Sequence, residues 1–239
     1  MVIVYLTILT IFAGGIGTLT GFGTSTIMVP VLLLFFPLPQ TLLLVGIIHW
    51  FGDIWKLILF RQGIRWKILL GFGIPGIITS FLGASLTFSA PEELMQRILG
   101  GFLIAYVIFL FIKSSFKLPQ NNYTAISGGT LSGFFAGIFG IGGAVRSAFL
   151  SAFDLPKAVY LATTGGIALI IDSSRLVTYY MNGSRLESIL MWGLLAFVPA
   201  SLLGAKLAKY IVEKIPQNYF RIVIAVFLFL TGLKLLLVP

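Results

Sequence analysis

Two glycine-rich stretches interrupt the apolar sequence of this chain: Gly21-Phe22-Gly23-Thr24-Ser25-Thr26 and Phe139-Gly140-Ile141-Gly142-Gly143-Ala144. Both lie in strongly apolar surroundings, where backbone groups without hydrogen-bond partners are costly and intact helix is the rule. A helix breaks at membrane depth only where it is buried in protein or lines a cavity. Paired breaks in two related halves are typical of a transporter's substrate site. The two stretches therefore predict a membrane protein whose site lies between the breaks.

The composition of the chain indicates that the lipid bilayer is its solvent. Of the 239 residues, 58% are hydrophobic and 10% are charged, and the mean hydropathy is +1.06. A soluble domain carries about 25% charged residues, and a soluble fold of this length could not bury so much apolar surface. We therefore expect an all-α polytopic membrane protein.

The charge balance and the absence of cysteine exclude several classes of partner. Lys and Arg outnumber Asp and Glu by 16 to 7, which fits cytoplasmic loops and anionic lipid, or a positive potential that attracts anions. The basic residues are dispersed and no nucleic-acid-binding signature accompanies them, so nucleic acid is not an expected partner. Without cysteine, disulfides and thiolate metal sites are excluded, and no metal or cofactor is expected.

Ten apolar segments follow one another along the chain. Two of them, Ile27–Phe36 and Ala144–Phe153, are shorter than the roughly 20 residues that a spanning helix needs, so we interpret them as half-helices that follow a break. About eight transmembrane segments are expected. The remaining segments are Val2–Leu19, Thr41–Phe60, Trp66–Phe88, Leu94–Ile112, Tyr123–Phe139, Ala158–Met181, Ile189–Ile211 and Tyr219–Val238.

The order of motifs predicts an internal duplication, with residues 1–118 as the first membrane repeat and 119–239 as the second, in one integrated transmembrane domain. Phe22-Gly23 aligns with Phe139-Gly140 at an offset of 139 − 22 = 117 residues. Asp53-x-x-Lys56 aligns with Asp172-x-x-Arg175 at an offset of 172 − 53 = 119. Whether the repeats are parallel or inverted depends on whether the first helix and its short partner form a re-entrant hairpin.

The breaks have a chemistry that suits an oxygen-rich anion. Glycine permits the backbone angles that leave a helix, and freed amides together with the start of the next half-helix present positive partial charge. The hydroxyls of the first break add donors. The alternative is that these small residues only allow close helix packing. The candidate anion-binding residues of the breaks are Gly21, Gly23, Thr24, Ser25, Thr26, Gly140, Gly142 and Gly143.

Arg146 is a charged residue inside the second short segment. A charge at membrane depth is costly and usually functional, and a guanidinium can bind a sulfonate, carboxylate or phosphate through two hydrogen bonds. The alternative is that Arg146 extends to the membrane interface. Thr163 and Thr164 belong to a small, hydroxyl-rich patch that either faces the second break or packs against a neighbour.

Charged residues repeat at matching positions in the two halves. His49, Asp53 and Lys56 are spaced i, i+4, i+7 and therefore share one helix face, and Asp172 and Arg175 repeat the last two. One interpretation is mutual charge neutralisation of each carboxylate by the cation three residues on. The other is that a carboxylate takes up a proton and couples transport to a proton gradient.

These motifs resemble those of the sulfite exporter family TauE/SafE, also described as sulfonate uptake permeases, over nearly the whole chain. The likeness is carried by Thr20–Pro30, by Gly137–Gly143 and by the basic loop Arg61-Gln62-Gly63-Ile64-Arg65-Trp66. The first copy departs from the family in having Thr24-Ser25-Thr26 where glycines are usual. The second copy has Arg146 and lacks a proline at Ser147.

The resemblance implies movement of sulfite, sulfonates or related sulfur-containing anions across a prokaryotic inner membrane. We therefore expect a secondary transporter for a small anion, working by alternating access in the lipid bilayer. A passive anion channel of the same fold is the alternative. An intramembrane enzyme is more distant, because no nucleophile–base pair or metal set is recognisable. The anion, the direction, the coupling ion and the oligomeric state, a homodimer included, stay open.

Overall fold

The structure, a computed structural model, describes residues 1–60, 63–112, 118–211 and 217–238. These residues form an all-helical molecule, as the sequence predicts, and the apolar segments become helices with ends shifted by a few residues. The elements are α1 (Val2–Thr20), α2 (Ser25–Leu32), α3 (Leu38–Leu59), α4 (Trp66–Thr87), α5 (Glu92–Ile112), α6 (Asn122–Phe139), α7 (Gly143–Leu150), the short 3-10 helix η1 (Ser151–Phe153), α8 (Lys157–Met181), α9 (Ser188–Ile211) and α10 (Gln217–Leu237).

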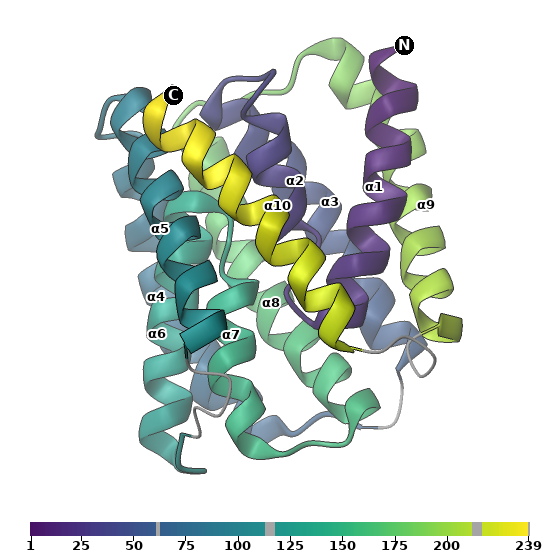
Figure 1. The fold of residues 1–239 in the computed structure, drawn as a ribbon, viewed down its shortest axis with the longest axis vertical. Coiled ribbons are helices and arrows are strands. Elements are labelled where there is room, and N and C mark those ends of the chain that lie inside the picture. The colour runs from purple at the N-terminus through teal and green to yellow at the C-terminus, as the bar shows by residue number, and fades with distance from the viewer. Residues whose placement is uncertain (61–62, 113–117, 212–216, 239) are drawn as a thin grey trace.

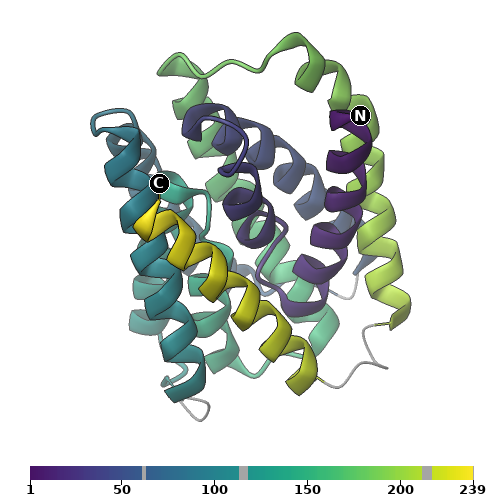
Figure 2. The ribbon, with the colours of Figure 1, turned by 45° about the horizontal axis from the view of Figure 1, so that its top comes forward.

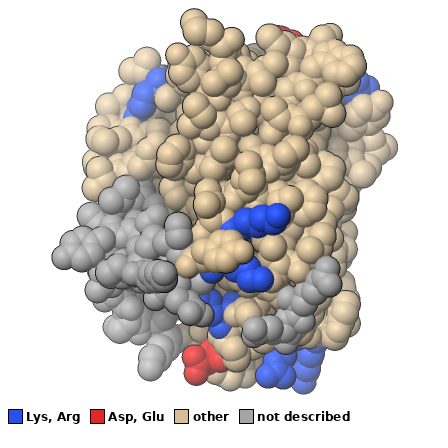
Figure 3. Space-filling view, turned by 90° about the vertical axis from the view of Figure 1, so that its right-hand side faces the viewer, with Lys and Arg blue, Asp and Glu red and all other residues tan. Residues whose placement is uncertain are grey.

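Four of the described helices are long and apolar enough to cross a membrane: α1, α3, α4 and α9. Their apolar side chains also cover the outer surface, where Phe12 is 65% and Leu195 is 72% exposed. Figure 3 shows the face on the α1–α9 side, on which uncharged residues dominate; Lys and Arg lie at both upper corners and in the lower half of the view. Such a predominantly uncharged outer surface suits contact with lipid. The chain is therefore a multi-pass membrane protein.

Helices α6 and α8 run opposite to α1 and α3 (Figure 1). The chain enters α1 and α3 from the end of the molecule that carries the N-terminus, but enters α6 and α8 from the other end. After each break the chain turns back, so that α1 and α2, like α6 and α7, form a hairpin; Figure 2 shows the first of these side by side. Each hairpin packs along a long helix of the other half, α1 on α9 and α6 on α4.

Glycines in α6 and α9 let these pairs approach closely. A Cβ at Gly137 would overlap the carbonyl oxygen of Ser80 in α4, and one at Gly204 would overlap the carbonyl oxygen of Ile11 in α1. Thr79 adds a hydrogen bond of 2.8 Å from its Oγ1 to a backbone carbonyl of α6. Gly137 and Gly204 therefore serve close helix packing.

Helix α3 crosses α8 in an antiparallel arrangement at the centre of the molecule. Trp50 of α3 donates from Nε1 to Ser173 Oγ of α8 at 2.9 Å. One turn further on, Trp55 donates from Nε1 to Ser201 Oγ of α9 at 3.0 Å. These two bonds fix the register of α3 against both of its neighbours in the second half.

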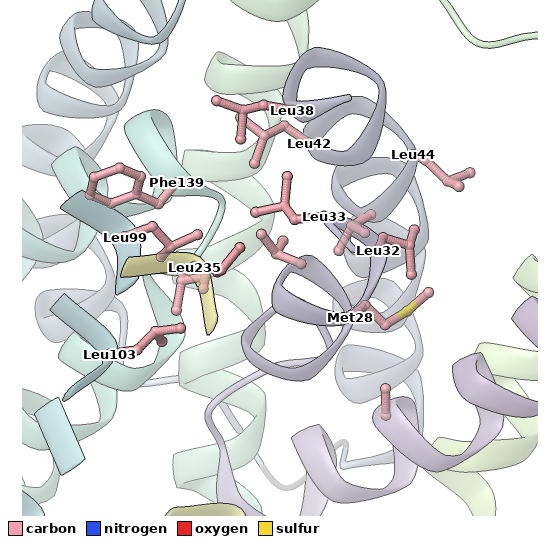
Figure 4. Close-up of a cluster of buried hydrophobic side chains, with 14 of the residues drawn as sticks. Met28, Leu32, Leu33, Leu38, Leu42, Leu44, Leu99, Leu103, Phe139 and Leu235 are labelled. Atoms are coloured by element: carbon pink, nitrogen blue, oxygen red, sulfur yellow. The ribbon is translucent and has the colours of Figure 1, made fainter. Parts of the chain in front are cut away.

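The short helix α2 is enclosed by other helices. Figure 4 shows its Met28 and Leu32, with Leu33 directly after it, among leucines of α3, α5 and α10, and Met28 and Leu32 are fully buried. A helix of eight residues is about 12 Å long, so it cannot span a bilayer whose hydrocarbon core is about 30 Å thick. It is held in place instead by burial, as expected for a half-helix.

Candidate functional site

The first break is formed by glycines in left-handed conformations. Gly21 has φ 75° and Gly23 has φ 83°, angles that only glycine adopts without strain. The amide of Gly23 returns to the carbonyl of Gly17 at 3.2 Å, which ends α1 and turns the chain into α2. Thr26 Oγ1 donates to the carbonyl of Phe22 at 2.9 Å and stabilises this turn.

The second break repeats this geometry with one residue fewer. Gly140 has φ 72°, and the amide of Ile141 returns to the carbonyl of Phe135 at 3.2 Å. The first left-handed glycines are 140 − 21 = 119 residues apart, whereas the two short helices begin 143 − 25 = 118 residues apart. At the break Gly21 therefore corresponds to Gly140, so the alignment of Phe22-Gly23 with Phe139-Gly140 is wrong by two residues at this point. The first break also contains one residue more than the second.

The two breaks contact each other directly. Gly143 at the start of α7 lies against Phe22 so closely that a Cβ would overlap the Phe22 carbonyl oxygen. Ser147, one turn later, donates from Oγ to the carbonyl of Gly21 at 2.9 Å. The meeting of the breaks, which the sequence predicts, is thus observed, and it places residues from both halves around one spot.

Next to the breaks, α3 and α8 bury a cluster of charged side chains. Lys56 Nζ donates to Asp53 Oδ1 at 2.8 Å. Arg175 donates two hydrogen bonds to Asp172, from Nε to Oδ1 at 2.7 Å and from Nη2 to Oδ2 at 3.0 Å. The pairing of each carboxylate with the cation three residues on is confirmed. All four side chains are at most 2% exposed.

His49 joins the two ion pairs into one cluster. Its Nδ1 lies 2.6 Å from Asp172 Oδ2 and 3.5 Å from Asp53 Oδ2. The other ring nitrogen, Nε2, has no hydrogen-bond partner and abuts the first break, where a Cβ at Gly23 would overlap it. His49 therefore connects the carboxylates of both halves to the backbone of the first break.

Arg146 is buried inside the protein, with 1% exposure. Its Nε donates to Thr164 Oγ1 of α8 at 2.9 Å, while its Nη2 has no hydrogen-bond partner. The alternative in which Arg146 extends to the membrane interface is wrong, because its side chain is buried and bonded to Thr164 of α8. Its surroundings include the charges of Asp53 and Asp172.

The buried charges do not cancel. Among the side chains that the structure describes, the buried cations are Lys56, Arg146 and Arg175, and the buried carboxylates are Asp53 and Asp172. With His49 neutral, this leaves an excess of one positive charge. Arg146 Nη2 and Arg175 Nη1 are both buried without a hydrogen-bond partner. A buried cation without a partner is costly, so the cluster is suited to holding an anion.

Of the predicted anion-binding residues with a hydroxyl group, some lie at the breaks or beside Arg146, and one lies elsewhere. Thr24 and Ser25 are buried at the start of α2, and Ser25 Oγ has no hydrogen-bond partner. Thr164 faces Arg146 as described, but Thr163 accepts a hydrogen bond from the amide of Arg65 at 3.2 Å. Thr163 therefore fastens the start of α4, and we leave it out of the site.

Sequence reasoning missed three residues around the breaks. Ser147 bridges to Gly21 as described above, and the ring of Tyr160 packs against that same glycine. Tyr179 donates from its hydroxyl to the carbonyls of Ala136 and Gly137 at the end of α6. A usable signal existed for Tyr160, because it precedes Thr164 by four residues and so shares its helix face.

A metal ion is not what this cluster is built to hold. One donor atom from each of His49, Asp53 and Asp172 lies within 4.8 Å of the others, which is a spacing that a metal could use. However, Lys56 and Arg175 already occupy the carboxylates, and both would repel a metal cation. The donors suit ion pairs and a proton better.

The ion pair of α3 gives a first testable prediction. Asp53→Asn leaves Lys56 buried without its counter-charge, which typically costs about 3–5 kcal/mol. Lowered thermal stability of the purified protein is expected. The double variant Asp53→Asn/Lys56→Met removes both charges and is expected to recover most of that loss. An Asp53→Asn protein as stable as the wild type would contradict the pairing.

Paired broken helices and a buried, cation-rich cluster place the molecule in the class of membrane transport proteins. The chain belongs to the sulfite exporter TauE/SafE family, which it matches over residues 6–235. A comparison with curated proteins gave no match. Of the basic loop that contributed to the resemblance, Arg61 and Gln62 lie outside the described residues, and Gly63 turns the chain with φ 112°.

Proposed function

We propose that this protein is a secondary transporter of a small anion, with sulfite, an organosulfonate or a related sulfur-containing anion as its substrate. The observation that carries the proposal is the excess positive charge of the buried cluster beside the two touching breaks. An oxyanion there would accept hydrogen bonds from Arg146 Nη2 and Arg175 Nη1, and from the start of α2 through Ser25. Such charge-assisted bonds are the strong ones. Family membership supports the substrate class.

The glycines have a defined part in this proposal. Gly21, Gly23, Gly140, Gly142 and Gly143 turn the chain so that the amides at the starts of α2 and α7 are not used up by a preceding helical turn. Helix starts favour anions. Thr24 lies at the start of α2, Thr26 stabilises the turn before it, and Thr164 holds Arg146. The breaks thus supply neutral donors, and the arginines supply the charge.

The proposed transport cycle is alternating access by two homologous, inverted halves, residues 1–118 and 119–239. The opposite directions of corresponding helices (Figure 1) and the matched breaks support this view. Because each hairpin packs on a helix of the other half, we propose that the hairpins move with those helices as two bodies. The site at their contact would then open to one side at a time. We place the protein in a prokaryotic inner membrane.

Anion binding by the purified protein tests the proposal. Thermal stability is measured with sulfite, sulfate, thiosulfate, taurine, sulfoacetate, acetate, phosphate and chloride. A ligand at a hundred times its Kd stabilises the native state by about 2.7 kcal/mol, so a clear rise in Tm is expected for sulfur oxyanions. No rise with any of these anions at millimolar concentration would contradict the proposed site.

The rival function is a passive anion channel of the same fold. Whether the anion accumulates against its gradient distinguishes the transporter from this channel. In sealed proteoliposomes a channel carries an anion only down its electrochemical gradient. A secondary transporter driven by a second gradient carries it uphill. Uphill uptake of labelled sulfite would support the transporter, and strictly downhill flux would favour the channel.

A further inference from the structure

We propose that His49 is the proton site of this transporter, and that it takes up one proton when the anion binds. The inference rests on the proposed function and deepens it by naming the coupling ion and the residue that carries it. His49 is the sole histidine of the chain, and histidine is the side chain that ordinarily changes charge near neutral pH. Its two ring nitrogens face different surroundings, Nδ1 the carboxylates and Nε2 the first break.

The carboxylates fix the tautomer of the neutral ring. Lys56 and Arg175 hold Asp53 and Asp172 as ionised partners, and an ionised carboxylate can only accept a hydrogen bond. With Asp172 Oδ2 at 2.6 Å, the hydrogen of His49 is therefore assigned to Nδ1. The opposite nitrogen, Nε2, then carries a lone pair.

That lone pair is buried at the place proposed for the anion. Nε2 has no hydrogen-bond partner and lies against Gly23 in the first break. Facing an anion, a lone pair is repulsive, whereas a protonated Nε2–H is a charge-assisted donor. The geometry thus favours the neutral ring in the empty site and the imidazolium in the occupied one.

The charges around His49 also favour its protonation only when the anion is bound. From α3 it faces Asp53 and Lys56, and from α8 it faces Asp172 and Arg175, which balance one another. From α7, Arg146 adds an uncompensated positive charge. A proton on His49 would raise the excess of the empty cluster from one to two positive charges. An anion lowers this excess, so proton and anion strengthen each other's binding, as linkage requires.

Two further features stabilise the protonated ring of His49. Asp53 Oδ2 has no hydrogen-bond partner and lies 3.5 Å from His49 Nδ1. An imidazolium therefore has carboxylate oxygens from both halves on one side and the anion on the other. The glycine at position 23 leaves room for the contact between Nε2 and the break. Proton, anion and both halves of the molecule meet at this ring.

Nitrogen NMR tests the inference on the unaltered protein. The full chain, labelled with ¹⁵N-histidine and carrying no histidine tag, gives signals from His49 alone. At neutral pH, adding sulfite is expected to move the Nε2 resonance from the unprotonated to the protonated range. Sulfite binding, seen as a rise in Tm, without any change in the His49 signals would overturn the proposal while leaving the proposed function intact. Absence of binding by every anion of the panel would overturn the proposed function itself.

Transport under a pH gradient supplies the second test. In proteoliposomes with the membrane potential held at zero, one proton per anion lets a gradient of about one pH unit drive roughly tenfold accumulation of labelled sulfite. Because sulfite itself titrates, the wild type is compared with His49→Gln, and the accumulation of the variant is expected to fall to that of protein-free liposomes. Glu187→Gln, an exposed change outside the cluster, serves as the matched control. Equal accumulation by His49→Gln and wild type would overturn the proposal.

Discussion

Arg146→Ala is expected to abolish transport while leaving the protein folded. The guanidinium provides up to two charge-assisted hydrogen bonds to the anion, each worth about 1.5–3 kcal/mol. Their loss is expected to weaken anion binding by roughly a hundredfold or more. In the empty protein the same change removes a buried charge that has one nitrogen without a hydrogen-bond partner. The Tm without anion is therefore expected to stay the same or to rise.

Sulfite uptake and thermal stability are both measured for the Arg146→Ala protein. Uptake of labelled sulfite into proteoliposomes gives the functional loss, and the Tm with and without sulfite separates loss of binding from loss of folding. Arg97→Ala is the matched control, because Arg97 is 45% exposed and pairs with Glu93 at the molecular surface. Wild-type transport and wild-type stabilisation by sulfite in Arg146→Ala would remove Arg146 from the site.

Gly143→Ala is expected to separate the two breaks. The added methyl would overlap the carbonyl oxygen of Phe22, which is backbone and cannot swing aside as a side chain can. Overpacking of this kind costs typically about 1–3 kcal/mol. The start of α7 is then displaced from the first break, together with Arg146 one turn later. We expect a loss of sulfite transport of at least roughly tenfold, the equivalent of about 1.4 kcal/mol at the site.

The control for this substitution is a glycine with free space around it. A Cβ at Gly101 in α5 meets nothing within 4 Å, and alanine is favoured over glycine inside a helix by about 1 kcal/mol. Gly101→Ala is therefore expected to transport normally and to be as stable as the wild type or slightly more so. Normal transport by Gly143→Ala would show that the contact between the breaks is dispensable.

Local features of the fold were predictable from the sequence, because they depend on neighbours along the chain. The length of apolar runs gave the helices to within a few residues, and glycine clusters gave the breaks. The spacing of His49, Asp53 and Lys56 correctly placed them on one face, and the pairing of Asp53 with Lys56 followed from the same spacing. The resemblance gave the family, which the comparison confirms.

Contacts between distant segments could not be predicted in the same way. Periodicity tells which face of α3 is buried but not which helix covers it, so the bond between His49 and Asp172, 123 residues apart, was out of reach. Arg146 was ambiguous for the same reason, since its burial depends on Thr164 in α8. The extra residue in the first break was missed because glycine-rich sequences align at several offsets.

The two tryptophan bonds of α3 give the protein an optical signal of its own. Trp50 is tied to α8 and Trp55 to α9, and the chain contains only four tryptophans. Indole emission responds to the loss or gain of a hydrogen bond at Nε1. Intrinsic fluorescence would therefore report any displacement of α3 relative to α8 or α9 without an attached dye, and Trp50 would do so one residue away from His49.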